Sequence, residues 1–541
     1  MMHRNKSVNV HSFAMVPQSD VPRSSFRMER KLTTAFDSGL LIPCLCEEML
    51  PGDTFNLSAT QFGRLTTPIV PFMDNLYMDT HYFFVPNRLV WANWVKFMGE
   101  QASPGDNTSF NIPQMVSQAG GYVVGSIFDY FGLPTAGQVA GANTVTHSAL
   151  PLRAYALIFN QWFRDENLVT PFGPGANTGD GPDLYTNMAL MRRGKRHDYF
   201  TSALPWLQKS TTSVTLPLGS TAPVIGTGVG GHGTPTFWNV VDNTTAQFMQ
   251  RASNAGNAPV QVLGGATTAG VQVLGWNATA LVADLSTATA ATINQIRQAF
   301  QLQKLLEKDA RGGTRYTEVV RAHFGVASPD ARLQRPEYLG GGSQLINVSP
   351  IAQTSATGVT GSTTPGGNLN AVGHVVARNG FTYSSVEHGY VIGLVSVRAD
   401  LTYQQGLRRH WSRLTRQDYY FPVFAMLGEQ AILNKEIYCD GSANDALVFG
   451  YQERWGELRY LPSEITGKMR STAAGTLDVW HAAQKFTGLP TLNQTFIEEN
   501  PPIARLSAVP SEPQIKMDQF VTIKAARPLP MYSVPGLIDH F

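Results

Sequence analysis

The sequence predicts an all-β-dominated fold with many turns, long inserted loops and a few helices. Charged residues make up only 15% of the 541 residues, against about 25% in typical soluble domains. Fifty glycines and 33 prolines divide the chain into short segments, which favours strands joined by turns. Several segments, such as the aromatic-rich run from Leu76 to Pro86, have the composition of a strand.

The elements are predicted in the following order along the chain. Residues 1–35 form a basic N-terminal arm, and residues 36–541 form the main domain, which begins with several strands up to Trp91. Residues 100–150 and 170–183 are loops, and the segment 150–167 between them is helical. A second uncharged stretch runs from Tyr338 to Ala377, and strands resume at Phe381. The chain ends in a strand and a proline-broken tail.

The clearest helix is predicted from Ile293 to about Arg311. Thr292 and Gln295 have the spacing of a capping box, and the Gly-Gly pair that follows Arg311 supplies a left-handed stop. Apolar residues share one broad face of this helix, and Arg, Lys and Gln side chains gather on the other face. The basic stripe either faces solvent or faces phosphate.

The stretch between Ser210 and Ala283 carries almost no charge. Asp242 and Arg251 are the only charged residues among these 74, and the Gly, Ala, Thr and Val content indicates short strands and turns. Large exposed apolar patches usually mark interaction surfaces. We therefore expect copies of the chain to bury this stretch against one another.

The sequence contains no motif that carries a catalytic or metal site. A G-x-G-x-x-G pattern at residues 226–231 is not followed by a helix, and Gly467-Lys468 lacks the remainder of a phosphate loop. Cys44 and Cys46 do not complete a zinc site and are predicted to be small buried residues. No apolar run reaches the ~18 residues of a membrane span, and three cysteines do not form a disulfide framework. We expect a cytoplasmic, cofactor-free, non-enzymatic protein.

Two basic segments are interleaved with aromatic residues. Cations beside rings are what single-stranded nucleic acid requires, because phosphates contact the cations and bases stack on the rings. The alternative is that these arginines pair with Asp or Glu of the same chain or of a neighbouring subunit. The basic residues of the two segments are Arg192, Arg193, Lys195 and Arg196, and Arg408, Arg409, Arg413 and Arg416.

Several blocks in order along the chain resemble the major capsid protein of the microviruses, and more closely its gokushovirus branch. These blocks include RRGKRHDYFTSALPWLQK, LEKDARGGTRYTEVVRAHFG, SPDARLQRPEYLGGG, YQERWGELRYLPSEITGK and the closing YSVPGLIDHF. The resemblance implies an eight-stranded antiparallel jelly roll with long inserted loops. It also implies a T=1 icosahedral shell of sixty copies around circular single-stranded DNA.

The resemblance also implies positions and partners. It places residues 210–283 in an exterior protrusion at the threefold axes, where the apolar side chains of Phe237, Trp238 and Trp276 meet and where the shell contacts a host surface receptor. Charge gives a further expected partner: sixty copies at +2 sum to +120, which is too little for a kilobase genome with one negative charge per nucleotide, so a small basic DNA-binding protein or abundant cations are expected inside. A minor or pilot protein is also expected, with assembly in the bacterial cytoplasm and no membrane insertion. The arm residues expected to face DNA are Arg4, Lys6, Arg23, Arg27, Arg30 and Lys31. The rival class is a carbohydrate-binding or hydrolytic jelly roll, since fold does not settle function.

Overall fold

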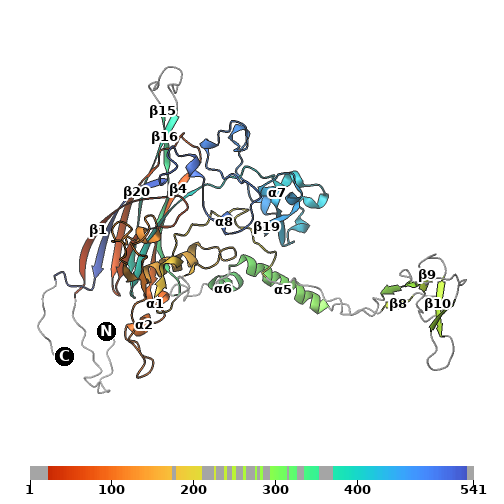
Figure 1. Cartoon of the computed structure of the whole chain (residues 1–541), viewed down its shortest axis with the longest axis horizontal. Coiled ribbons are helices and arrows are strands. Elements are labelled where there is room, and N and C mark those ends of the chain that lie inside the picture. Colours follow the sequence, from red (N-terminus) through yellow and green to blue (C-terminus); the bar gives the residue numbers. More distant parts are fainter. Residues whose placement is uncertain are drawn as a thin grey trace. The chain divides into compact units, whose positions relative to one another are not determined.

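The chain divides into two compact units (Figure 1). A computed structural model describes residues 22–173, 178–209, 224–226, 237–239, 246–251, 260–263, 274–276, 281–283, 293–313, 316–325, 334–352 and 369–532. We call Met1–Leu207 together with Gly312–Phe541 the sheet unit, and Gln208–Arg311 the insert unit.

The sheet unit contains two large antiparallel sheets, which confirms the predicted predominance of β-structure. The larger sheet has the strand order β1-β20-β3-β16-β15 and the smaller has the order β14-β4-β17-β2. The strands of the larger sheet are β1 (Ser24–Phe36), β20 (Ile515–Arg527), β3 (Thr54–Leu65), β16 (Leu369–Ser384) and β15 (Asn347–Ala352). Those of the smaller sheet are β14 (Glu337–Leu345), β4 (Leu76–Pro86), β17 (Gly389–Ala399) and β2 (Ile42–Met49).

The two sheets pack face to face around one core. Apolar side chains alternate with exposed ones along β3, β16 and β20, as the two-residue period of a strand requires. Two buried clusters mix side chains from both sheets: Met78 and Val397 of the smaller sheet pack with Met517 of the larger one, and Tyr82 packs with Val521. The larger sheet therefore buries one face and leaves the other face exposed in the single chain.

Short helices cover the second face of the smaller sheet. Strands β4 and β17 are buried along nearly their whole length, because Phe83 and Leu394 pack against a cluster formed by these helices. The helices are α1 (Asn87–Val90), α2 (Trp94–Phe97), α3 (Ile127–Tyr130) and α4 (Leu150–Ile158). The helix predicted at 150–167 corresponds to α4 and a π-helical turn, Phe159–Phe163. A small sheet of order β6-β5-β7 lies in the expected loops, with β5 (Gln114–Val116), β6 (Thr146–Ser148) and β7 (Asp183–Leu184).

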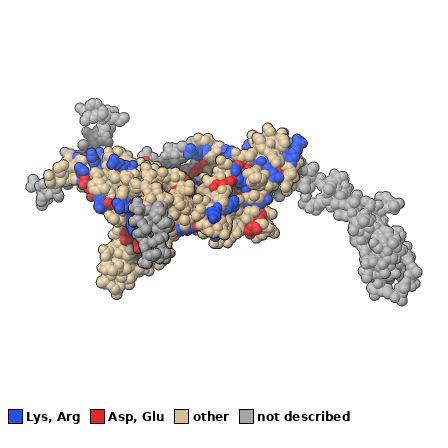
Figure 2. Space-filling view, turned by 90° about the horizontal axis from the view of Figure 1, so that it is seen from above, with Lys and Arg blue, Asp and Glu red and all other residues tan. Residues whose placement is uncertain are grey.

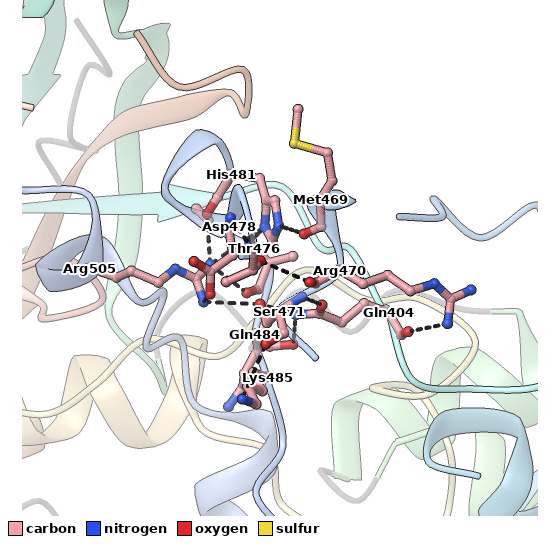
Figure 3. A network of polar contacts seen from close by, with 12 residues as sticks. Gln404, Met469, Arg470, Ser471, Thr476, Asp478, His481, Gln484, Lys485 and Arg505 are labelled. Atoms are coloured by element: carbon pink, nitrogen blue, oxygen red, sulfur yellow. Dashed lines mark hydrogen bonds and ion pairs between the residues drawn. The ribbon is translucent and has the colours of Figure 1, made fainter. Parts of the chain in front are cut away.

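Irregular chain between β17 and β20 is held by a separate apolar cluster, which includes Ile432 and Phe496, and by polar side chains. It contains β18 (Glu429–Leu433) paired with β19 (Val448–Glu453), and the short helices α7 (Asn434–Ile437) and α8 (Gln494–Ile497). Figure 3 shows one polar network in this region. The Arg505 guanidinium donates to the carbonyls of His481 and Ala483 at 2.7 and 3.0 Å, while the Gln404 amide and Ser471 bond reciprocally. These bonds tie neighbouring loops together.

The insert unit contains six short strands and one long helix among its described residues. The strands form an order β11-β10-β9-β12 and a separate pair, β13-β8. They are β8 (Val224–Gly226), β9 (Phe237–Asn239), β10 (Ala246–Arg251), β11 (Val260–Leu263), β12 (Leu274–Trp276) and β13 (Leu281–Ala283). Helix α5 spans Ile293–Arg311, which confirms the predicted bounds. Gly313, in the sheet unit, has φ +91°, as expected for a left-handed stop.

Two expectations need correction. Strands do not resume at Phe381, because β14, β15 and most of β16 precede it. Three consecutive glycines, at 340–342, are typical of a turn. In β14 they instead let the backbone of this strand approach β4 closely, because a side chain at Gly341 would collide with the Thr80 carbonyl. The basic arm is also shorter than residues 1–35, since Ser24–Phe36 form β1 and pair with β20 over thirteen residues. Helix α6 (Tyr316–Phe324) was not predicted.

Candidate nucleic-acid and subunit interfaces

The first basic segment, residues 192–196, makes its contacts within the chain. The Arg193 guanidinium lies 2.6 Å from the Asp79 carboxylate, which Arg398 also contacts at 2.8 Å. Lys195 donates to the Gln484 amide oxygen at 2.9 Å. Arg196 lies 3.4 Å from Asp400, and Arg192 donates to two backbone carbonyls. Intramolecular pairing, one of the two alternatives for this segment, therefore occupies these groups; contact with DNA stays a prediction.

The same segment lines a cavity of about 550 Å³ over the smaller sheet. Its wall contains His81, whose ring lies 5.6 Å from that of Phe163 and 5.9 Å from that of Tyr338. Burial, with a contribution from the Arg193 charge, lowers the pKa of His81 to about 4. Burial also lowers the pKa of Lys195 to about 8. The cavity is thus a place where burial disfavours added positive charge.

The second basic segment, residues 408–416, also forms ion pairs. Arg409 lies 3.0 Å from Glu436, and Arg413 lies 3.3 Å from Glu457. Arg408 makes a more exposed pair with Glu464 at 3.2 Å. The Arg416 guanidinium lies over the Phe421 ring at 5.3 Å. This segment borders a second cavity, of about 560 Å³, and its contact with DNA also stays a prediction.

Large apolar side chains are exposed around this second segment. Leu414 and Met426 are 92% and 95% exposed, and they are accompanied by Trp411, Val423 and Leu461. Several large exposed apolar side chains within one short stretch of chain are typical of an interaction surface. Residues 411–427 with Leu461 are therefore a candidate contact between copies of the chain.

The residues expected in the basic arm fall into three groups. Arg4 and Lys6 lie outside the described residues. Arg23 precedes β1 and donates to Thr54 at 2.9 Å. Within β1, Arg27 and Lys31 point away from the core, whereas Arg30 is half-buried on the core side.

The exposed face of the larger sheet carries four further cations that the sequence analysis missed. Arg64, Arg378, Lys516 and Lys524 lie on β3, β16 and β20, on the same side as Arg27 and Lys31. The alternation of basic and apolar residues in IKMDQFVTIKAAR was the available signal, since residues two apart share a face of a strand.

The expected protrusion contacts lie in the four-stranded sheet of the insert unit. Phe237 and Trp238 belong to β9, and Trp276 belongs to β12. Trp276 is directly opposite Phe237 in the register, and Gly275 is opposite Trp238. The backbone thus brings these residues together, and their role between copies stays a prediction.

No described residues form a group of three or more His, Cys, Asp or Glu that could hold a metal ion. Cys44 is buried, as expected, and Cys46 is half-buried; burial raises the pKa of both thiols to about 12.

Among the helices that the structure describes, none has the length and apolarity to cross a membrane. Figure 2 shows Lys and Arg in several groups over the face in view, interspersed with Asp and Glu.

Two face-to-face antiparallel sheets with long inserted loops, and no metal-binding group among the described residues, are consistent with a structural protein. Comparison with known proteins defines the class. The family described as "Capsid protein (F protein)" matches residues 14–537, and the chain belongs to this family. It is a capsid protein of small single-stranded-DNA phages of the Microviridae, a virion component and not an enzyme.

Three relatives share nearly the full length of the chain. The capsid protein VP1 of Bdellovibrio phage phiMH2K is 46% identical over 98% of this chain and 99% of its own. VP1 of Chlamydia phage 1 is 42% identical, and VP1 of Spiroplasma virus 4 is 36% identical, each over 98% of both chains. These similarities place the chain with the gokushovirus branch that its sequence blocks resemble.

Proposed function

We propose that sixty copies of this chain assemble into a T=1 icosahedral shell around circular single-stranded DNA, and that its two large sheets are an eight-stranded jelly roll. The family match over residues 14–537 carries the proposal. The strand order supports the jelly roll. When β15 is set aside, the remaining eight strands in chain order form sheets of order 1-8-3-6 and 2-7-4-5, as in two interleaved Greek keys.

Contacts between copies are proposed at two places. One is the apolar cluster of residues 411–427 with Leu461, because an isolated chain would leave it in water. The other is residues 210–283, proposed as the exterior protrusion at the threefold axes, with its outer end against the bacterial surface. Separation of Gln208–Arg311 as its own compact unit supports an insertion of this kind.

Charge supports a further partner inside the shell. Sixty copies at a formal +2 each sum to +120, whereas single-stranded DNA carries one negative charge per nucleotide. The shell by itself therefore does not neutralise a genome of kilobase length. A small basic protein or abundant cations are proposed to supply the difference. Arg4, Lys6 and Arg23, together with Arg27 and Lys31 of β1, are proposed to face the DNA, whereas Arg30, the sixth expected residue, is half-buried on the core side of β1. A minor or pilot protein is the remaining proposed partner.

Electron microscopy of the purified full-length chain tests the proposal. Icosahedral particles, or pentamers that convert to them, are the expected result. A chain that stays monomeric at every concentration and salt condition, or that forms only open filaments, would contradict a closed shell. Density placing the N-terminal arm on the outer surface would remove its proposed contact with DNA.

A further inference from the structure

The exposed face of the five-stranded sheet concentrates positive charge. We call this surface the basic sheet face; its defining residues are Arg27, Lys31, Phe62, Arg64, Arg378, Lys516, Phe520 and Lys524. Their side chains lie on one side because the strands are in register: Lys31 is opposite Phe520, Phe520 is opposite Thr60, and Thr60 is opposite Arg378. Directly opposite residues share a face.

The charge of this face exceeds that of the whole chain. Six cations stand against two carboxylates, those of Glu29 and Asp518, so the face carries a formal +4. The whole chain carries +2, so all remaining residues together sum to −2. Glu29 pairs with Arg27, and Asp518 lies 3.3 Å from Lys31. The excess positive charge is therefore spread across the sheet and not confined to one edge.

Aromatic rings lie among these cations. Phe520 is 47% exposed near the middle of β20, although a phenylalanine at a solvent-facing strand position gains little from burial in the single chain. Phe62 lies on the adjacent strand, two residues along from the position opposite Phe520, a diagonal separation of about 7–8 Å. The Arg64 guanidinium lies 5.1 Å from the Phe62 ring centroid. Exposed rings beside cations are the combination that binds single-stranded nucleic acid.

The dimensions suit an extended strand of DNA. From β1 to β16 the face crosses three strand spacings, or about 14 Å, and from Lys516 to Lys524 it runs about 27 Å along β20. A second copy of the chain, packed through its own basic sheet face, would bring like charges together. Each copy would then bury six cations against only two carboxylates. A polyanion with stackable bases satisfies both the charge and the rings.

We propose that the basic sheet face is the surface that holds single-stranded DNA, with phosphates along its lysines and arginines and bases stacked on Phe520 and Phe62. The inference rests on the proposed shell around single-stranded DNA and assigns its inner wall to this sheet.

Binding of a fluorescent twenty-nucleotide oligothymidylate to the full-length chain tests the proposal, with affinity measured by anisotropy across a salt series. Phe520→Ala should weaken binding about tenfold, as for the loss of one stacked base. Lys516→Gln with Lys524→Gln should reduce the slope of log affinity against log salt by about 1.4, because each single-strand phosphate contact contributes about 0.7. A duplex of equal length should lose little with Phe520→Ala.

Matched variants outside the basic sheet face test whether binding is specific to this surface. Phe324→Ala removes an exposed ring on α6, and Lys96→Gln with Lys468→Gln removes two exposed charges elsewhere. These should leave both affinity and salt slope unchanged. The inference would be overturned if the control variants lost as much affinity as the sheet variants, or if the sheet variants lost none. A wild-type chain that does not bind the oligonucleotide would also overturn it. Particle formation by the wild-type chain is measured in a separate experiment. Failure of the proposed shell can therefore be told apart from failure of the proposed DNA surface. Circular dichroism confirms folding of each variant.

Discussion

Removing one partner of the buried ion pair between Arg153 and Asp183 should destabilise the sheet unit strongly. Arg153 on α4 is fully buried, and two of its nitrogens each lie 2.7 Å from a carboxylate oxygen of Asp183. The third nitrogen donates to the carbonyls of Val90 and Gly179 at 3.0 and 2.8 Å. The pair thus ties helix α4 to β7 and to the end of α1.

Arg153→Met would leave the Asp183 carboxylate buried without its cation. Loss of one partner of a buried pair costs about 3–5 kcal/mol, which is more than a hundredfold in the local opening equilibrium. Arg459→Met is the control, because Arg459 and Glu453 form an exposed pair at 2.8 Å, and exposed pairs contribute about 1 kcal/mol or less.

Hydrogen–deuterium exchange of the unassembled chain measures the effect. Amides of α4 and of residues 178–184 should lose protection in Arg153→Met and keep it in Arg459→Met. Combining Arg153→Met with Asp183→Leu should recover part of the loss, since the charge left behind is then removed. Protection of α4 equal to that of the control variant would refute the reasoning.

Two further predictions concern a close backbone approach and a half-buried histidine. Gly39→Ala should cost about 3 kcal/mol or more, because Gly39 has φ +81° and a side chain there would collide with the Glu499 carbonyl; Gly52→Ala, with φ +87° in open space, should cost about 1 kcal/mol in the same urea unfolding experiment. For His81, burial lowers the folded pKa to about 4 from 6.5, so the unfolded chain binds a proton first as pH falls. Stability should decline by up to about 3 kcal/mol between pH 6.5 and 4. His81→Gln should reduce this decline, the exposed His197→Gln should not, and equal curves for both variants would contradict the assignment.

The sequence predicted those elements whose local pattern is strong. Helix α5 has a 3.6-residue period followed by two glycines, and β4 is a dense aromatic run, so their bounds could be predicted. Strand β14 was not predicted because three consecutive glycines are typical of a turn, and β1 was not predicted because its cations are typical of a solvated arm.

Contacts that join distant residues could not be predicted from local pattern. The pairing of β1 with β20 joins Ser24 to Arg527, and no spacing in the sequence contains that information. The same holds for the arginine segments: the composition around Arg193 and Arg409 is equally suited to phosphate and to carboxylate, and the fold supplies Asp79 and Glu436. The basic sheet face likewise exists only once four strands are placed side by side.

A single-particle reconstruction of DNA-filled particles tests the central claim most directly. The expected map shows sixty copies in a closed shell, with residues 210–283 raised on the exterior at the threefold axes. The basic sheet face lies on the inner wall, against ordered DNA density. A shell in which the basic sheet face lies on the outer surface or between subunits, with DNA density elsewhere, would contradict it.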